Sequence, residues 1–84
     1  MKRYELDKMA FEYIHKSINS SYINEYFKNE IFMKLESNII LSEEEMSYLI
    51  TAITFNKELV DSYRNYLIEV LENPIEKDEE GAFA

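Results

Sequence analysis

The sequence predicts an all-α fold, a small antiparallel bundle of four helices followed by a flexible acidic C-terminal tail. Apolar residues recur at helical spacing in four separate segments of the 84-residue chain. The chain holds one glycine and one proline, too few for the tight turns of a multi-stranded β fold. Its length allows a single domain, which we place at residues 1–74, with the tail at residues 75–84.

The first predicted helix covers residues 5–18. Glu12 and Lys16 have the acid-then-base spacing that stabilises an exposed helix face. The polar run at residues 19–21 ends this helix and supplies a cap for the next one. The apolar residues share one face because they follow the i, i+3, i+4, i+7 rule. They are Leu6, Met9, Ala10, Tyr13, Ile14 and Ile18.

The second predicted helix covers residues 21–36 and is apolar over more than one face. Glu30 and Lys34 repeat the acid-then-base spacing of the first helix. Aromatic residues at 22 and 32 lie away from the main apolar row. That row has a spacing of four and consists of Ile23, Phe27, Ile31 and Leu35.

The third predicted helix has the clearest start signal in the chain. Ser42 and Glu45 have the spacing of a capping box, in which each side chain accepts a hydrogen bond from the other residue's backbone amide. Residues 43–45 are all glutamate, and negative charge is favoured at this end of a helix. The helix is therefore expected to begin at Glu43 and to continue to about Phe55.

The fourth predicted helix covers about residues 57–72, and its boundary with the third is left open. Asn56 separates the two helices, but neither glycine nor proline enforces a break there. An apolar stripe also continues through both segments, so one helix of roughly 30 residues, and three helices in total, is the alternative. Asn73 and Pro74 end the last helix, because the residue before a proline avoids the helical region.

The formal net charge is −8, and the whole excess lies in the second half of the chain. Residues 1–41 hold six bases and six acids, whereas residues 42–84 hold three bases and eleven acids. Such a balance argues against direct contact with nucleic acid and against an anionic membrane. The acids either solvate the chain or form a face that steers it toward a basic partner.

The residue types needed for catalysis are scarce. With no cysteine and a single histidine, His15, the chain lacks the ligands of a metal site. No glycine-rich phosphate loop is present, so no cofactor is expected. Small helical chains rarely offer a deep pocket, and we therefore expect a binding protein and no enzyme. No apolar run approaches the roughly 20 residues of a membrane span and no secretory leader is evident, which predicts a cytoplasmic location.

Aromatic residues exceed what one narrow apolar stripe needs. The chain has seven tyrosines and five phenylalanines, and Tyr22, Phe32, Tyr48 and Phe55 form the surplus. Tyrosine is enriched at interfaces, so these residues either cover the core or form a docking surface or dimer seam. The candidate protein-binding residues combine the acids of the second half with two aromatic anchors. They are Glu43, Glu44, Glu45, Tyr48, Phe55, Asp61, Glu69 and Glu72.

The segment 41–50 resembles the acidic second helix of the nuclease-colicin immunity proteins, which are acidic four-helix proteins that block a basic nuclease. The shared pattern is mostly the capping box. The tyrosine pair of that family has no match here, because Arg64 and Asn65 separate Tyr63 from Tyr66. The resemblance implies that an acidic helical protein of this size suits an inhibitor.

Two functions are expected from these observations. The first is a small acidic inhibitor or regulator that docks on a basic, nucleic-acid-binding surface of a larger protein, such as a nuclease. Phages and mobile elements encode proteins of this kind against host defence. The alternative is a homo-oligomeric structural or transcription-associated module, in which the surplus aromatics close the seam of a homodimer.

Overall fold

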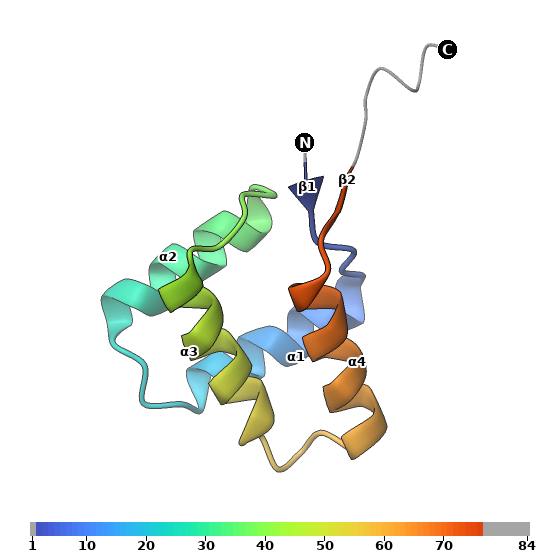
Figure 1. Cartoon of the computed structure of the whole chain (residues 1–84). Helices are drawn as coiled ribbons and strands as arrows, with labels where there is room; N and C mark the ends of the chain where they lie inside the picture. The colour runs from blue at the N-terminus through green and yellow to red at the C-terminus, as the bar shows by residue number, and fades with distance from the viewer. Residues whose placement is uncertain (1, 77–84) are drawn as a thin grey trace.

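The computed structural model describes residues 2–76 of the chain, and in them it has four α-helices and one pair of short strands (Figure 1). The predicted all-α fold of four helices is confirmed. None of the helices in this range is both long enough and apolar enough to span a membrane. The elements are β1 Lys2–Arg3, α1 Lys8–Asn19, α2 Glu25–Glu36, α3 Glu43–Thr54, α4 Asp61–Glu72 and β2 Ile75–Glu76.

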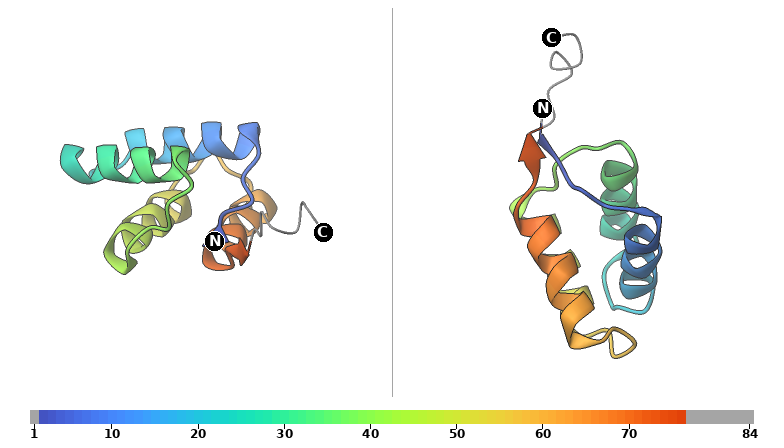
Figure 2. Two further views of the ribbon diagram at one scale, coloured as in Figure 1. Left: turned by 90° about the horizontal axis from the view of Figure 1, so that it is seen from above. Right: turned by 90° about the vertical axis from the view of Figure 1, so that its right-hand side faces the viewer.

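The helices form two layers, with α1 and α2 in one and α3 and α4 in the other (Figure 2). α1 packs against both α2 and α3, and α3 packs against α4. The core lies between the layers, so the outer faces of α3 and α4 remain available to solvent. The large aliphatic side chains that are fully buried are Ile14, Ile18, Ile31, Leu49, Ile53, Leu67 and Leu71.

Two helices begin later than the apolar pattern predicts, because polar side chains cap them at a later residue. The Asp7 carboxylate accepts a hydrogen bond from the Ala10 amide at 2.8 Å, and α1 starts at Lys8. The Asn24 side chain accepts one from the Tyr26 amide at 2.7 Å, and α2 starts at Glu25. Residues 20–24 therefore form a loop beside α3.

The capping box at the start of α3 is confirmed. Ser42 Oγ accepts a hydrogen bond from the Glu45 amide at 3.1 Å, and Glu45 Oε1 accepts one from the Ser42 amide at 2.9 Å. Lys34, which the helical spacing pairs with Glu30, instead donates to both carboxylate oxygens of Glu45, at 2.8 and 3.0 Å. Burial would raise the pKa of Glu45, but the hydrogen bonds from Lys34 and Ser42 outweigh it and hold the pKa below its usual value.

A turn centred on Asn56 separates α3 from α4, so the single long helix is excluded. The Asn56 side chain accepts a hydrogen bond from the Glu58 amide at 2.9 Å and donates one to Ser17 Oγ at 2.8 Å. Ser17 is buried on α1, and its hydroxyl also donates to the Tyr13 carbonyl at 2.9 Å. The break is thus fixed by a polar contact to a helix distant in sequence.

Arg64 closes the same turn from α4. Its guanidinium donates to the backbone carbonyls of Ile53, Asn56 and Leu59 at distances of 2.8–3.3 Å. It also forms an ion pair with Asp61, one turn earlier on α4. The last carbonyls of a helix have no partner within the helix, and here an arginine side chain supplies donors at the end of α3.

The strand pair was not predicted, because two residues are too few for a periodic pattern. Lys2 lies opposite Glu76, and Arg3 lies opposite Ile75, in antiparallel register. The tail was predicted to begin at residue 75, but its first two residues form β2, and residues 77–84 lie outside the described part of the chain. Next to β1, the buried Tyr4 hydroxyl accepts a hydrogen bond from the Leu41 amide at 2.9 Å, and burial raises its pKa.

Candidate docking surface

Two open hollows flank the outward face of α3. Ser47 and Thr51 are exposed residues of α3 that line both hollows, and they form the ridge that separates one hollow from the other. One hollow lies between α3 and the end of α4, and we call it the acidic hollow. The other lies between α3, the loop at residues 20–24 and the start of α2, and we call it the aromatic groove. Together they make one continuous surface across α3.

The acidic hollow has a volume of about 690 Å³. α3 and α4 run in opposite directions, so the start of one meets the end of the other (Figure 1). This arrangement brings Glu43 and Glu72 to the same hollow, with apolar side chains between them. Its twelve lining residues are Tyr4, Ile40, Leu41, Ser42, Glu43, Met46, Ser47, Ile50, Thr51, Leu71, Glu72 and Pro74.

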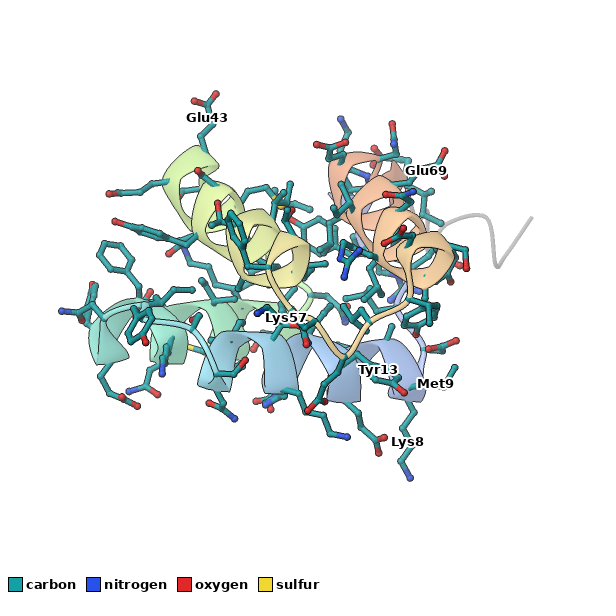
Figure 3. The ribbon with its side chains drawn as sticks, turned by 90° about the horizontal axis from the view of Figure 1, so that it is seen from below. Lys8, Met9, Tyr13, Glu43, Lys57 and Glu69 are labelled. Atoms are coloured by element: carbon teal, nitrogen blue, oxygen red, sulfur yellow. The ribbon has the colours of Figure 1, made fainter. Side chains whose placement is uncertain are left out.

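The acids near this hollow differ in whether the dipole of their own helix favours or disfavours their negative charge. Glu43 and Glu44 lie in the first turn of α3, where the helix dipole favours negative charge. Glu69 and Glu72 lie in the last turn of α4, which contains no base and where negative charge is disfavoured. In Figure 3, Glu43 and Glu69 both project from the α3–α4 layer on the side away from α1. We therefore expect the α4 acids to lower the stability of their own helix.

Little positive charge compensates these acids. Residues 43–72 contain seven acids and two bases, a net charge of −5. Of the two bases, Arg64 binds Asp61 and the turn carbonyls, and Lys57 lies in the loop at the opposite end of the helix pair (Figure 3). None of the described residues that line the acidic hollow is basic. Lys2 and Arg3 belong to the strand pair, and Arg3 lines a separate hollow together with Tyr66 and Val70 of α4.

The aromatic groove has a volume of about 910 Å³ and no charged residue in its lining. Along α3 and its C-cap residue Phe55, the residues Tyr48, Thr51 and Phe55 follow Glu44 at spacings of four, three and four, so the four side chains share one face. The floor includes Ala52, which is buried. The lining residues are Ser17, Ser20, Ser21, Tyr22, Ile23, Asn24, Phe27, Ser47, Tyr48, Thr51, Ala52 and Phe55.

Three of the four surplus aromatics line this groove. Tyr22 is fully exposed and Phe55 is 76% exposed, whereas Tyr48 is half-buried with its ring centre 5.0 Å from that of Phe27. Phe32 lies elsewhere, stacked on His15 with ring centres 4.0 Å apart. Large exposed aromatics gathered in one hollow are typical of an interaction surface.

The predicted site residues thus fall into separate places. Glu43 and Glu72 meet at the acidic hollow, and Glu69 is exposed in the same turn as Glu72. Tyr48 and Phe55 meet at the aromatic groove, with Glu44 on the same helix face. The two remaining acids have partners within the chain, because Glu45 binds Lys34 and Asp61 binds Arg64.

Of the groove wall that faces α3, the sequence indicated only Tyr22 as a surplus aromatic that could form a docking surface. Tyr22, Ile23 and Phe27 form this wall, and the sequence placed them inside a helix that began at residue 21. The signal that would have found the wall is Asn24, a strong N-cap residue, which shifts the helix start and leaves Tyr22 in a loop.

Within residues 2–76, no group of three or more His, Cys, Asp or Glu side chains is arranged to hold a metal ion. No protein-family model matches the sequence, and comparison with curated proteins and with solved structures finds no similar chain. The two hollows beside α3 hold four of the eight predicted site residues, which are Glu43, Glu72, Tyr48 and Phe55.

Proposed function

We propose that this chain is a small acidic protein that inhibits or regulates a larger protein by occupying its basic, nucleic-acid-binding surface. The observation that carries this proposal is the pair Glu69 and Glu72 in the last turn of α4. Their charges oppose the helix dipole and are not neutralised by a base in that turn. Local choices that lower stability without an internal compensation are expected at functional positions.

The chemistry of the acidic hollow fits a basic partner surface. Surfaces that bind nucleic acid are rich in lysine and arginine, and a cluster of carboxylates competes with phosphates for them. Charges of opposite sign accelerate association and make it depend on salt. Half-buried Met46 and Ile50 lie beside the acids, and their burial by the partner would add affinity that exposed ion pairs alone do not provide.

We extend the proposal to the setting that such a partner implies. A nuclease or another nucleic-acid-binding complex of a host defence system presents the required basic surface. A phage or mobile element is the kind of source that gains from blocking it. This part rests on the charge and the size of the chain.

The test compares two charge-matched double variants. Glu69→Gln with Glu72→Gln removes two charges from α4, and Glu12→Gln with Glu36→Gln removes two exposed charges from α1 and α2. Proteins captured by each form from the source cell are identified by mass spectrometry, and the affinity for the main one is measured at two salt concentrations. We expect the α4 variant to bind about tenfold more weakly, and the control to bind within about twofold of the natural chain. Equal affinities, or binding insensitive to salt, would contradict the proposal.

The second candidate function is a homo-oligomeric module, and the exposed aromatic groove favours it. A homodimer formed through this groove would bury Tyr22 and Phe55, which are otherwise in contact with water. Light scattering over a range of concentrations tests this alternative. A dimer mass that becomes a monomer mass in Tyr22→Ser with Phe55→Ser would support it, and a monomer mass at all concentrations would exclude it.

A further inference from the structure

We propose that the aromatic groove receives a segment of the partner that carries an aromatic or aliphatic anchor side chain with lysine or arginine beside it. This inference rests on the proposed function, because it assigns a second contact to the same partner. It also specifies the partner further, since a basic surface alone would occupy the acidic hollow and leave the groove empty.

The size and lining of the groove suit an inserted side chain. Its volume of about 910 Å³ falls in the range of pockets that hold small ligands. Ala52 is a small residue at the floor, and the rings of Tyr48 and Phe27 lie beside it, 5.0 Å apart. An inserted ring would extend this aromatic pair and would be covered by Phe55 from α3 and Tyr22 from the loop.

The two walls differ in how they would contact a peptide. In the loop wall, the hydroxyls of Ser20 and Ser21 donate to the Ser17 and Ile18 carbonyls, at 3.2 and 2.6 Å. These hydrogen bonds hold the loop next to α1. In the helix wall, Ser47 and Thr51 are exposed on the ridge of α3, and a hydroxyl at each position can hydrogen-bond the backbone of a segment that crosses the ridge.

Charge decides which segment fits. The lining carries no charge, but its α3 face continues to Glu44, and its ridge is shared with the acidic hollow that contains Glu43. Bases beside the anchor would therefore lie near these carboxylates, whereas acids there would be repelled. A second copy of the chain brings a further net charge of −8 and its own Glu43 and Glu44 on the same face, so it fits less well than a basic segment.

The two hollows then have separate kinetic roles. The exposed acids of the acidic hollow act over a distance, so they raise the association rate and make it salt-dependent. The groove acts at contact by burying apolar surface, so it slows dissociation. Loss of the groove contact is therefore expected to weaken binding even in high salt, where the acids contribute little.

The experiment uses three synthetic peptides and the isotope-labelled full chain, with binding located by NMR chemical shifts of backbone amides. One peptide has a phenylalanine–leucine anchor between pairs of lysines, the second has serines in place of the anchor, and the third has the same anchor between pairs of glutamates. We expect the first peptide to shift the amides of Tyr48, Thr51 and Phe55. The second should shift only the amides around the acidic hollow, and the third should shift neither set.

Variants make the assignment specific. Phe55→Ala and Tyr22→Ala truncate exposed side chains, so the fold is kept, and Met9→Ala is a matched control, because Met9 is 52% exposed on α1 and outside the groove. Each groove variant should weaken the anchored lysine peptide by about fivefold to tenfold and leave the serine peptide unchanged. Met9→Ala should change neither peptide.

The possible failures are distinguishable. If the anchored lysine peptide shifts only the acidic hollow, the groove inference is overturned and the proposed function stands. If neither lysine peptide binds at any concentration, both are overturned. Equal groove binding by the glutamate peptide would overturn the requirement for bases. Groove shifts that follow protein concentration alone would show that a second copy occupies the groove, which also overturns the inference.

Discussion

The two ends of the α3–α4 pair use charge in opposite ways. At the loop end, Arg64 forms an ion pair with Asp61 and donates hydrogen bonds to the carbonyls of the turn, so the partners of its positive charge lie within the chain. At the other end, Glu43, Glu69 and Glu72 are exposed, and the hollow that Glu43 and Glu72 line has no base among its described lining residues. The comparison shows that a charged side chain holds the fold where it has an internal partner, and remains available to a binding partner where it has none.

The same difference is present within a single helical turn. Glu45 is 6% exposed and binds Lys34 and the Ser42 amide, whereas Glu44 next to it is exposed. Three consecutive glutamates therefore do not share one role. Four predictions and one matched control test how the internally bound polar groups differ from the available charges, beginning with the largest expected effect.

Arg64→Ala is expected to lower the free energy of unfolding by about 3 kcal/mol, because three backbone carbonyls lose a charged donor. Arg64→Lys should recover less than half of this loss, since one ammonium group cannot match the planar fork of the guanidinium. Urea denaturation of the three proteins gives both numbers. A loss below about 1 kcal/mol for Arg64→Ala would mean that the loop end is not held by this side chain.

Glu45→Gln is expected to lower the free energy of unfolding by about 2 kcal/mol at neutral pH, because it removes a charged cap and leaves Lys34 unpaired. The folded pKa of Glu45 lies below its unfolded value near 4.5. Its contribution is therefore complete above pH 4.5 and is lost as the pH falls through the folded value. The natural chain should lose stability over this acidic range, and Glu45→Gln should lose less.

Glu44→Gln is the matched control for Glu45, since it removes the same charge one residue earlier. This substitution should lower the free energy of unfolding by about 0.5 kcal/mol, because it weakens the interaction with the dipole of α3. The stability of the variant should depend on pH in the acidic range as that of the natural chain does. Denaturation curves recorded from pH 3 to pH 7 compare the three forms. Identical pH profiles for both variants would remove the distinction between the buried and the exposed glutamate.

The buried pair of Ser17 and Asn56 is expected to show a coupling energy of about 1 kcal/mol in a double-mutant cycle with alanine at each position. Their hydrogen bond joins α1 to the turn between α3 and α4 at 2.8 Å. A coupling near zero would leave Arg64 as the main support of the loop end, and would thus sharpen the contrast between the two ends.

Glu69→Gln with Glu72→Gln is expected to raise the free energy of unfolding by about 0.5 kcal/mol at low salt, because two charges that oppose the dipole of α4 are removed. High salt should reduce the gain by screening. Thermal denaturation at two salt concentrations measures this effect. A loss of stability in this variant would show that Glu69 or Glu72 stabilises the fold. The two ends of the α3–α4 pair would then not differ in their use of charge.

The sequence predicted the parts of the fold that depend on neighbouring residues. The four helices follow from the spacing of apolar side chains, and the start of α3 follows from the Ser42–Glu45 capping box. The later starts of α1 and α2 could also have been found, because Asp7 and Asn24 are strong cap residues. For the candidate site, the sequence selected the acids and two aromatics but could not sort them into two hollows.

What the sequence by itself determined was the fold class, the position of the excess charge and the supply of surplus aromatic residues. Only the tertiary structure decided which of those groups are already bound within the chain. Lys34 binds Glu45 on another helix, Asn56 binds Ser17 across the core, and Arg64 closes the turn that separates α3 from α4. The physical reason is distance along the chain. Helical spacing and caps act within about four residues. The partners in these contacts are 5 to 39 residues apart and meet only when the helices pack.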